Sequence, residues 1–371
     1  MTPTPPSIPN ILRQAVYLGM SWTWCIGMFL PVLLIRDYGH WAWWVFAIPN
    51  IVGAAAMGWV VRSREQSVDY VRNHETAVRV FSLVTITFQF FFVFWMVRQL
   101  AGPYVTILGL VAAGGGAFAV RRFVSSICVL ALLVSTTLWL LAGSNLSYPP
   151  SSPPTLNLLW LTLSCLAGFL TCPYLDLTFH RARQQCSTST ESKWAFALGF
   201  GLFFAAMIVF TLLYATNLLN NATLARYVGI HMALQAGLTI ALHWHVLEAL
   251  PPLTDWRKLF NVLPVMVAMA LGLSTVAPSG ETTYRLFMSF YALVFPAYVI
   301  IHLKAGQRKH WYLLIATLAV AGPMFYAAFI AGYMIWLLPG TATLLVAYIA
   351  ADVIRQRPAT APPPPTLSAP R

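Results

Sequence analysis

Residues 21–31 read SWTWCIGMFLP and interrupt the first long apolar segment of the chain, 15–36. Pro31 has no N–H to donate to the carbonyl four residues earlier, which is that of Gly27. Glycine itself lowers helix preference by about 1 kcal/mol relative to alanine. A helix broken near Gly27 would free backbone carbonyls that bind a cation or a substrate amine. An ordinary proline kink is the alternative interpretation.

A second stretch, residues 164–173 (SCLAGFLTCP), has a similar order of Cys, Gly, Phe-Leu and Pro inside the sixth apolar segment. The first and sixth segments cross in opposite directions if the segments between them alternate. Gly/Pro-interrupted spans at corresponding places in two inverted halves indicate the binding site of a transporter. We therefore expect helix breaks near Gly27 and Gly168.

The composition places the chain in a membrane. Of its 371 residues, 59% are hydrophobic and only 9% are charged, whereas soluble domains have roughly 45–50% and about 25%. This excludes an ordinary soluble enzyme, a disordered protein and a nucleic-acid-binding domain. The lipid bilayer is the expected partner, and nucleic acid is not.

Twelve segments reach the length of about 20 mostly apolar residues that a helix needs to cross a bilayer. The sequence therefore predicts an all-α polytopic membrane protein with about twelve transmembrane helices, as two inverted five-helix repeats plus two extra helices. The segments are 15–36, 40–61, 78–98, 103–120, 123–143, 156–176, 194–216, 227–249, 259–277, 284–303, 311–331 and 333–351.

The positions of the basic residues give the orientation. With both termini cytoplasmic, all of the 22 Lys and Arg residues except Arg36, Arg98, Arg226 and Arg285 fall on the cytoplasmic side. Such asymmetry is typical of membrane proteins, because basic loops stay inside. We expect a multi-pass protein of the cell's inner (plasma) membrane.

The expected organisation follows the segments. Loops are short, and Ser144–Thr155 is a Pro/Ser-rich outer connector between two halves. The divisions are a cytoplasmic N-terminal segment (1–14), a first inverted repeat (15–143), the connector (144–155), a second inverted repeat (156–303), two extra spans (304–352) and a disordered Pro-rich tail (353–371).

The eighth segment carries a polar stripe. His231, Gln235, Thr239 and His243 are spaced by four residues, so they share one helix face. The face either lines a wet pathway or makes helix–helix hydrogen bonds. In other segments, Asn50 and Gln89 are isolated polar groups that need partners.

Carboxylates fall at segment ends, with Asp176 at a cytoplasmic end, so no carboxylate is expected deep in the membrane. His243 and His245 point about 200° apart on a helix and cannot easily share a metal. HExxH and CxxC spacings are absent, as is a Gly-rich phosphate loop. We expect no cofactor and no metal. The one expected ion is a coupling cation, either sodium or a proton.

Residues 172–181 (CPYLDLTFHR) resemble the proline-containing, Arg-ending segment after the sixth core helix of sodium:solute symporters and nucleobase–cation symporters. These families belong to the amino acid–polyamine–cation superfamily, with the leucine-transporter-type fold. The resemblance implies ten core helices in two inverted repeats, with broken first and sixth helices. The eighth segment offers only Thr239 where sodium-coupled members usually offer a Ser/Thr pair, so sodium dependence should be weak or absent.

The resemblance and the interrupted segments together give a set of candidate site residues. The expected solute-binding residues are Trp22, Trp24, Gly27, Gln89, Gly168, Thr171 and Gln235. Gly27 and Thr239 would bind the cation. A cytoplasmic gate would use Asp176, His180 and Arg181, for which a plain solvated loop is the alternative.

We expect a secondary active transporter, not an enzyme. It would move a small neutral or zwitterionic organic solute, with an apolar part, by alternating access. One alternative is a membrane-embedded enzyme acting on a lipid or isoprenoid, with His231, His243 or His180 as acid–base groups. Another is a receptor that keeps a transporter fold without transport. The sequence specifies neither the solute nor an oligomeric state.

Overall fold

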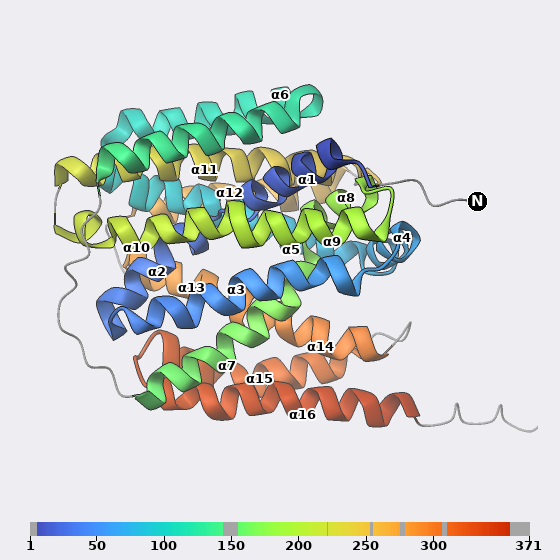
Figure 1. Cartoon of the computed structure of the whole chain (residues 1–371). Helices are drawn as coiled ribbons and strands as arrows, with labels where there is room; N and C mark the ends of the chain where they lie inside the picture. The colour runs from blue at the N-terminus through green and yellow to red at the C-terminus, as the bar shows by residue number, and fades with distance from the viewer. Residues whose placement is uncertain are drawn as a thin grey trace, which may run out of the picture.

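The computed structural model describes residues 6–143, 155–220, 222–252, 255–274, 279–305 and 310–356. Every regular element in these ranges is helical, and the long helices lie side by side in one bundle (Figure 1). The predicted all-α class is confirmed. Residues 144–154 of the expected connector and 357–371 of the expected tail lie outside the described residues. Residues 353–356, expected to belong to a disordered tail, are instead the end of the last helix.

The first part of the chain folds into long helices interrupted by one π-helical turn. The elements are α1 (Ile8–Ser21), α2 (Cys25–Tyr38), α3 (Trp41–Val60), α4 (Arg64–Asn73), α5 (Glu75–Phe92), η1 (Val93–Val97) and α6 (Arg98–Ala142). α6 contains non-helical backbone at Gly102, with φ 84°, and at Phe123, with φ −125° and ψ 30°. Figure 1 shows α6 folded back on itself as two arms.

The second part begins with α7, which enters a short 3-10 turn. Its elements are α7 (Thr155–Thr171), η2 (Cys172–Leu175), α8 (Leu177–Gln185), α9 (Ser189–Leu198), η3 (Gly199–Phe204), α10 (Ala205–Asn220), α11 (Ala222–Glu248), α12 (Asp255–Leu273), α13 (Gly280–Ser289), η4 (Phe290–Val294), α14 (Phe295–Ala305), α15 (Trp311–Phe329), η5 (Met334–Trp336) and α16 (Leu337–Gln356).

Among the described residues, seven helical stretches are long and apolar enough to cross a membrane, and the bent pair α1–α2 adds an eighth. The longest, Glu75–Ala142, runs for 68 residues, far more than the roughly 20 that one crossing needs. The protein is therefore a membrane-embedded helical protein, as the composition indicates.

The first helix is broken where α1 meets α2, with a bend of 55°. The break lies at residues 22–24, so the expected position near Gly27 is wrong: Gly27 and Pro31 lie inside α2. The reason is local side-chain bonding. Thr23 Oγ1 donates to the Gly19 carbonyl at 2.8 Å, and the Trp24 indole N–H donates to that of Ser21. These side chains replace the backbone donors that a continuing helix would supply.

α7 is likewise continuous through Gly168, so the break expected there is also wrong in position. It lies at η2, where Pro173 cannot donate to the carbonyl four residues earlier. Asp176 has an extended backbone, with ψ 110°, and its side chain caps the N-terminus of α8. Gly168 serves packing instead, because a Cβ there would lie 2.8 Å from the carbonyl oxygen of Tyr291.

Small residues of α3 pack closely, as its Gly/Ala content predicts. A Cβ on Gly53 would meet the Phe169 carbonyl oxygen of α7 at 2.4 Å, and one on Gly58 would meet Phe196 of α9 at 2.6 Å. Ala54 is fully buried between them. α3 therefore packs very closely against α7 and α9, and this close packing fixes the position of the second break.

Arg183 of α8 completes the end of α3. Its buried guanidinium donates to the carbonyls of Val61, at 2.8 Å, and Arg62, at 2.5 Å. These carbonyls follow the last turn of α3 and need a donor. The second break is therefore attached to α3 on both sides: α7, before the break, packs on Gly53, and α8, after it, is bonded through Arg183.

Candidate binding site

The two helix breaks meet inside the bundle. The hydroxyl groups of Ser21 and Thr178 are 3.1 Å apart, although the residues are far apart in the sequence. The rings of Trp22 and Phe179 lie 4.8 Å apart, centroid to centroid. Residues at the end of α1 therefore contact the start of α8 directly.

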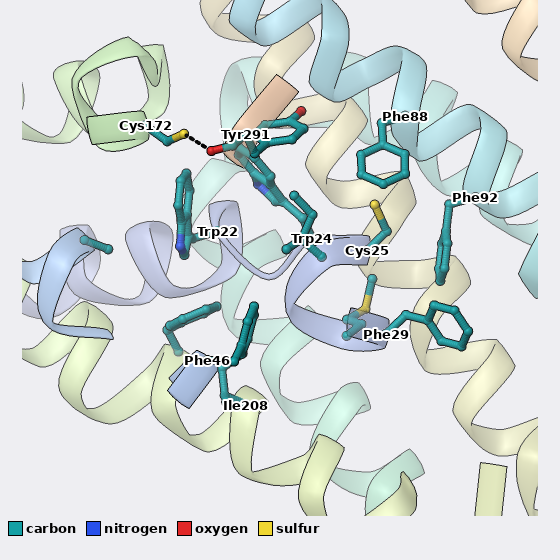
Figure 2. Packing of buried hydrophobic residues seen from close by; sticks show 14 of the residues in the cluster. Trp22, Trp24, Cys25, Phe29, Phe46, Phe88, Phe92, Cys172, Ile208 and Tyr291 are labelled. Carbon is teal, nitrogen blue, oxygen red and sulfur yellow. Dashed lines mark hydrogen bonds between the residues drawn. The ribbon is translucent and has the colours of Figure 1, made fainter. Parts of the chain in front are cut away.

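A small cavity lies against the first break. It has a volume of about 20 Å³, room for about one water molecule. Its lining consists of Trp22, Trp24, Ile26, Gly27, Asn50, Phe169, Cys172 and Tyr291. Figure 2 shows Trp22 and Trp24 beside Tyr291, whose carbonyl oxygen accepts a hydrogen bond from Cys172 Sγ at 3.4 Å.

Asn50 is the one amide in this lining, and its Oδ1 accepts a hydrogen bond from the Trp22 indole at 2.7 Å. This is the partner that the sequence requires for a buried amide in α3. The bond fixes the Trp22 ring, which packs against Trp24 at 4.4 Å between centroids. The pocket is therefore aromatic, with one polar edge.

Further cavities continue this pocket toward one end of the bundle. A second cavity, of about 60 Å³, shares Ile26, Phe169 and Tyr291 with the first and also borders Gly168 and Cys165. An open hollow of about 490 Å³ shares Tyr38, Arg285 and Phe329 with the second. Through these shared residues the three cavities lie in a row between the breaks and the surface, and the two inner cavities are lined mostly by apolar side chains. We refer to this row of cavities as the route.

Charged side chains surround the open hollow. Arg36 of α2 pairs with Glu281 of α13 at 2.7 Å, and Arg285 pairs with Asp37 at 2.5 Å. Arg36 also contacts Asp37 at 2.7 Å. The alternating charges tie α2 to α13 across the mouth of the route.

α11 also contacts the first break, through Thr239 and His243. Its polar stripe is inward-facing as predicted, because His231, Gln235, Thr239 and His243 are all at most 3% exposed. Thr239 Oγ1 lies 3.5 Å from the Thr23 carbonyl, and His243 Nδ1 lies 3.2 Å from Ser82 of α5. Thr239 therefore hydrogen-bonds to the first break, whereas His243 hydrogen-bonds to α5.

The structure brings part of the expected solute site together. Trp22, Trp24 and Gly27 line the first cavity, and Gly168 lines the second. Thr171 instead donates within its own helix, to the Ala167 carbonyl at 2.6 Å.

Like Thr171, two further expected residues lie outside both cavities. Gln89 is fully buried in α5, and neither of its amide atoms has a partner among the described residues. Gln235 donates to Ser135 of α6 at 2.7 Å. These amides therefore face the helix packing behind the break.

The two residues expected to hold a cation lie on different sides of the break. A Cβ on Gly27 would approach Ile208 and Phe204, at 3.3 and 3.5 Å. Thr239 faces the carbonyl of Thr23. No hydrogen bond among the described residues joins Gly27 to Thr239.

The expected gate residues have separate surroundings. His180 is buried in α8, where its Nε2 donates to the Tyr174 carbonyl and its Nδ1 accepts from the Ser67 hydroxyl, each at 2.9 Å. Burial lowers the pKa of His180 to about 4. Arg181 lies over the Tyr17 ring at 5.7 Å, and among the described residues no ion pair includes it.

Asp176 differs most from its expected place. The sequence indicates a charged turn at the cytoplasmic end of its segment. The structure shows that the Asp176 side chain is fully buried beside the junction of the breaks, 3.9 Å from His243. Tyr291, Phe169 and Cys172 are also missed, because single aromatic or thiol groups in apolar runs are normally packing residues. Only Cys172, next to the helix-breaking Pro173, gave a usable signal.

The chain was compared with known proteins. No protein-family model and no curated protein sequence matches it, so the geometry of the two breaks and their cavities is what supports a function.

Proposed function

We propose that the protein is a secondary active transporter that moves a small neutral or zwitterionic organic solute, with an apolar part, by alternating access. One observation carries the proposal: two helix breaks meet at the inner end of a line of cavities that leads to the surface. Irregular backbone within a membrane is tolerated where it is buried in protein or lines a cavity. Such discontinuous helices are typical of transporter binding sites.

We further propose twelve membrane spans in the leucine-transporter-type arrangement. The stretch Glu75–Ala142 counts as three spans, separated at Gly102 and Phe123. The bent pair α1–α2 is the first span, and α7, with its break at η2, is the sixth. Two inverted five-helix repeats would then be followed by α15 and α16.

The proposed orientation places α4 and α8 in the cytoplasm. Both helices carry arginines, among them Arg64, Arg72 and Arg183, and basic segments are retained inside. α1 starts and α16 ends at the same end of the bundle as α4 (Figure 1). Arg36 and Glu281 then surround the outer mouth in the plasma (inner) membrane.

The lining of the cavities supports the proposed class of solute. Trp22, Trp24, Phe169 and Tyr291 offer ring surfaces to an apolar group, and Asn50 offers an amide to a polar one. Within the described part of the chain, no Lys, Arg, Asp or Glu lines the inner cavity, which disfavours a strongly ionic solute. The present volume is too small for such a solute, so binding requires α2 and α13 to separate.

A cation site would use the Thr23 carbonyl and the Thr239 hydroxyl, which offer two oxygens without a carboxylate. A sodium ion prefers more oxygen ligands than this pair supplies. We therefore expect weak or absent sodium dependence. On the inner side, Asp176, His180 and Arg181 would close the site by burial and hydrogen bonding.

Native Cys165 offers a test of the route. It lines the second cavity, so a variant in which Cys25, Cys128, Cys172 and Cys186 become Ser reports access through Cys165 alone. In proteoliposomes, a membrane-impermeant thiol reagent should modify Cys165 from the side of Arg36. L-Leucine and L-tryptophan, as zwitterionic probes with apolar parts, should slow modification and accumulate inside the vesicles.

Gly27→Val adds a side chain beside the inner cavity, with its Cβ 3.3 Å from Ile208. It should displace α2 from its present packing at the cavity and so abolish this protection, and the variant is checked for folding by its elution as a single species in detergent. Gly201→Val is the matched control, because no atom of the neighbouring described residues lies within 4 Å of a Cβ added there. Modification of Cys165 only from the opposite side, or equal protection in Gly27→Val, would contradict the proposal. Protection without accumulation would favour the receptor alternative.

One observation keeps the enzyme alternative as a second candidate. His243 lies between Ser82 Oγ, at 3.2 Å, and Asp176 Oδ2, at 3.9 Å, an order that resembles a nucleophile, base and acid. Ser82 is fully buried and lines none of the cavities described above. Ser82→Ala should therefore leave probe uptake unchanged, and hydrolysis of a lipid ester lost in Ser82→Ala would favour the enzyme.

A further inference from the structure

Asp176 and His243 form a buried pair of titratable side chains where the two breaks meet. Both side chains are 0% exposed, and Asp176 Oδ2 lies 3.9 Å from His243 Nε2. Neither atom has a hydrogen-bond partner among the described residues. An N–H···O hydrogen bond is about 2.7–3.2 Å long. The two atoms therefore face each other across a gap that a small displacement would close.

The other polar atoms of the pair are occupied. Asp176 Oδ1 accepts hydrogen bonds from the backbone N–H of Thr178, at 2.7 Å, and from its hydroxyl, at 2.6 Å. His243 Nδ1 has the Ser82 hydroxyl at 3.2 Å. Oδ2 and Nε2 are thus the atoms left to share a proton.

The groups packed around the pair do not neutralise the carboxylate. α1 contributes Tyr17, η2 contributes Cys172, η4 contributes Tyr291, α5 contributes Ser82, and the Trp24 ring lies 5.4 Å from His243. Arg181 of α8 lies over the Tyr17 ring, and among the described residues no Lys or Arg is within ion-pair distance of Asp176. A buried charge without a bonded partner is costly, and one proton between Oδ2 and Nε2 removes that cost.

We propose that Asp176 and His243 bind one proton between them, that this proton holds the two helix breaks together, and that its release opens the site. The proton comes from water and returns to water, and it belongs to the pair rather than to one residue. Only one part of this inference rests on the proposed function: if the protein is a transporter, this proton is its coupling ion.

Both breaks are in contact with the pair. Asp176 caps α8 at the second break, and the His243 ring meets Trp24 of the first break edge-on at 5.4 Å. Without the proton, the carboxylate faces an imidazole lone pair, and repulsion separates the two elements. A ligand shifts a conformational equilibrium only by binding one state better than the other, and the proton meets this condition.

Thr178 gives a second connection between the breaks. Its single hydroxyl hydrogen has two neighbouring acceptors, Asp176 Oδ1 at 2.6 Å and Ser21 Oγ at 3.1 Å. An ionised carboxylate is the stronger acceptor, so it draws the hydrogen away from Ser21. Protonation of the pair returns the hydrogen to the bond that joins the two breaks.

The test measures opening without a solute. Nitroxide labels are placed at His40→Cys and Tyr333→Cys, both exposed and close in sequence to Tyr38 and Gly332, which line the outer hollow. The distance between the labels, measured by pulsed EPR in nanodiscs, reports the width of the hollow. The five native cysteines are replaced by Ser in this background. The ratio of open to closed molecules should rise with pH, by at most about tenfold per pH unit for one proton. An infrared carboxylic-acid band should disappear over the same pH range.

Asp176→Asn should remove both the pH dependence and the infrared band, leaving the closed form at every pH. Asn is itself a good N-cap, so α8 keeps its start. His243→Gln should move the midpoint by at least one pH unit. His231→Gln is the matched control, since His231 lies on the same buried face of α11 and has no carboxylate partner among the described residues.

A label distance that does not change with pH, or a pH dependence that persists in Asp176→Asn, would overturn the proton site. If Asp176→Asn does not fold, the His243→Gln variant still tests the proton site. An infrared band that disappears at the same pH in His243→Gln as in the wild type would also overturn it. Uptake is measured separately, with L-leucine and L-tryptophan under an imposed pH gradient. Absence of uptake with the pH response intact rejects the proposed transport but not the proton site.

Discussion

At the scale of single residues, the site depends on side chains that take over backbone hydrogen bonds. Thr23 and Trp24 bond carbonyls at the end of α1, and Asp176 caps the start of α8. Each of these hydrogen bonds contributes only modestly to stability, because on folding it replaces a hydrogen bond to water. Their combined effect is to hold two helix breaks at one place.

The Trp22–Asn50 bond should be measurable as a coupling energy. Trp22→Phe removes the donor and leaves a buried amide oxygen unsatisfied, which costs about 1–3 kcal/mol. Asn50→Leu in the Trp22→Phe background should recover part of this loss. A double-mutant cycle on thermal unfolding in detergent should give a coupling of about 1 kcal/mol, and additive effects would show that the bond contributes nothing.

His180 should make stability depend on pH. It lies in α8, beyond the apolar span, and burial, with a smaller contribution from nearby His74, lowers its pKa from 6.5 to about 4. Between these values the unfolded chain binds a proton that the folded protein does not. Stability should therefore fall as the pH drops from 6.5 to 4, by up to about 3 kcal/mol.

The comparison between the wild type and His180→Gln isolates this effect from the other buried histidines. Chemical unfolding at pH 7 and pH 4.5 should show a smaller pH-dependent loss in His180→Gln. His40→Gln, at an exposed position, should behave like the wild type. Equal losses in all three proteins would mean that His180 is protonated without cost.

At the scale of elements, close backbone approach places the cavities. α7 packs on η4 at Gly168 and on α3 at Gly53, in both cases against a carbonyl group. The π-helical turn η4 presents Tyr291 to the breaks, and such turns are frequent at functional sites. Small residues in α3 and α7 therefore determine how closely the aromatic side chains that line the inner cavity approach one another.

Gly168→Ala should destabilise this packing by about 1–3 kcal/mol, because the new methyl group would lie 2.8 Å from the Tyr291 carbonyl oxygen. Gly322→Ala is the matched control inside α15, where nothing lies within 4 Å of the added Cβ. It should be neutral or stabilising by up to about 1 kcal/mol. Thermal unfolding of the two variants in the same detergent makes the comparison.

The ion pairs between α2 and α13 should regulate opening more than stability. Partly exposed pairs are worth about 0–1 kcal/mol each, so Arg36→Ala should change the unfolding temperature little. It should nevertheless speed modification of Cys165 severalfold, because Glu281 loses one partner. Arg121→Ala removes a similar pair with Glu248 at 2.5 Å, on other helices, and should leave Cys165 unaffected.

At the scale of the whole molecule, the apolar helices identify a membrane protein, and the basic residues suggest its direction. A cysteine placed at Ser187, between α8 and α9, should react only from the cytoplasmic side. One placed at Ser151, in the connector outside the described residues, should react only from the outer side. Impermeant labelling of intact cells tests both, and the reverse pattern would invert the proposed topology.

Several features could be predicted from sequence because composition and periodicity determine them. These features are the helical class, the existence of a break in the first span and the buried stripe of α11. The break positions could not be predicted, because Gly and Pro have more than one use: Gly168 permits close packing, and Pro31 costs α2 only one backbone bond. Asp176 follows the last apolar residue of its segment, so its burial depends on helices distant in sequence.

The guanidinium of Arg183 has a consequence for how the protein is made. It donates to the Val61 carbonyl, at a sequence separation of 122 residues. At about 5–20 residues per second, the ribosome needs roughly 6–24 s to supply this donor after α3 has emerged. The end of α3 must therefore wait in the membrane, bonded to water or to the insertion machinery, until α8 arrives. The hydrogen bond between Arg183 and the end of α3 therefore forms late in biogenesis. Expressing the two halves as separate chains should delay its formation further.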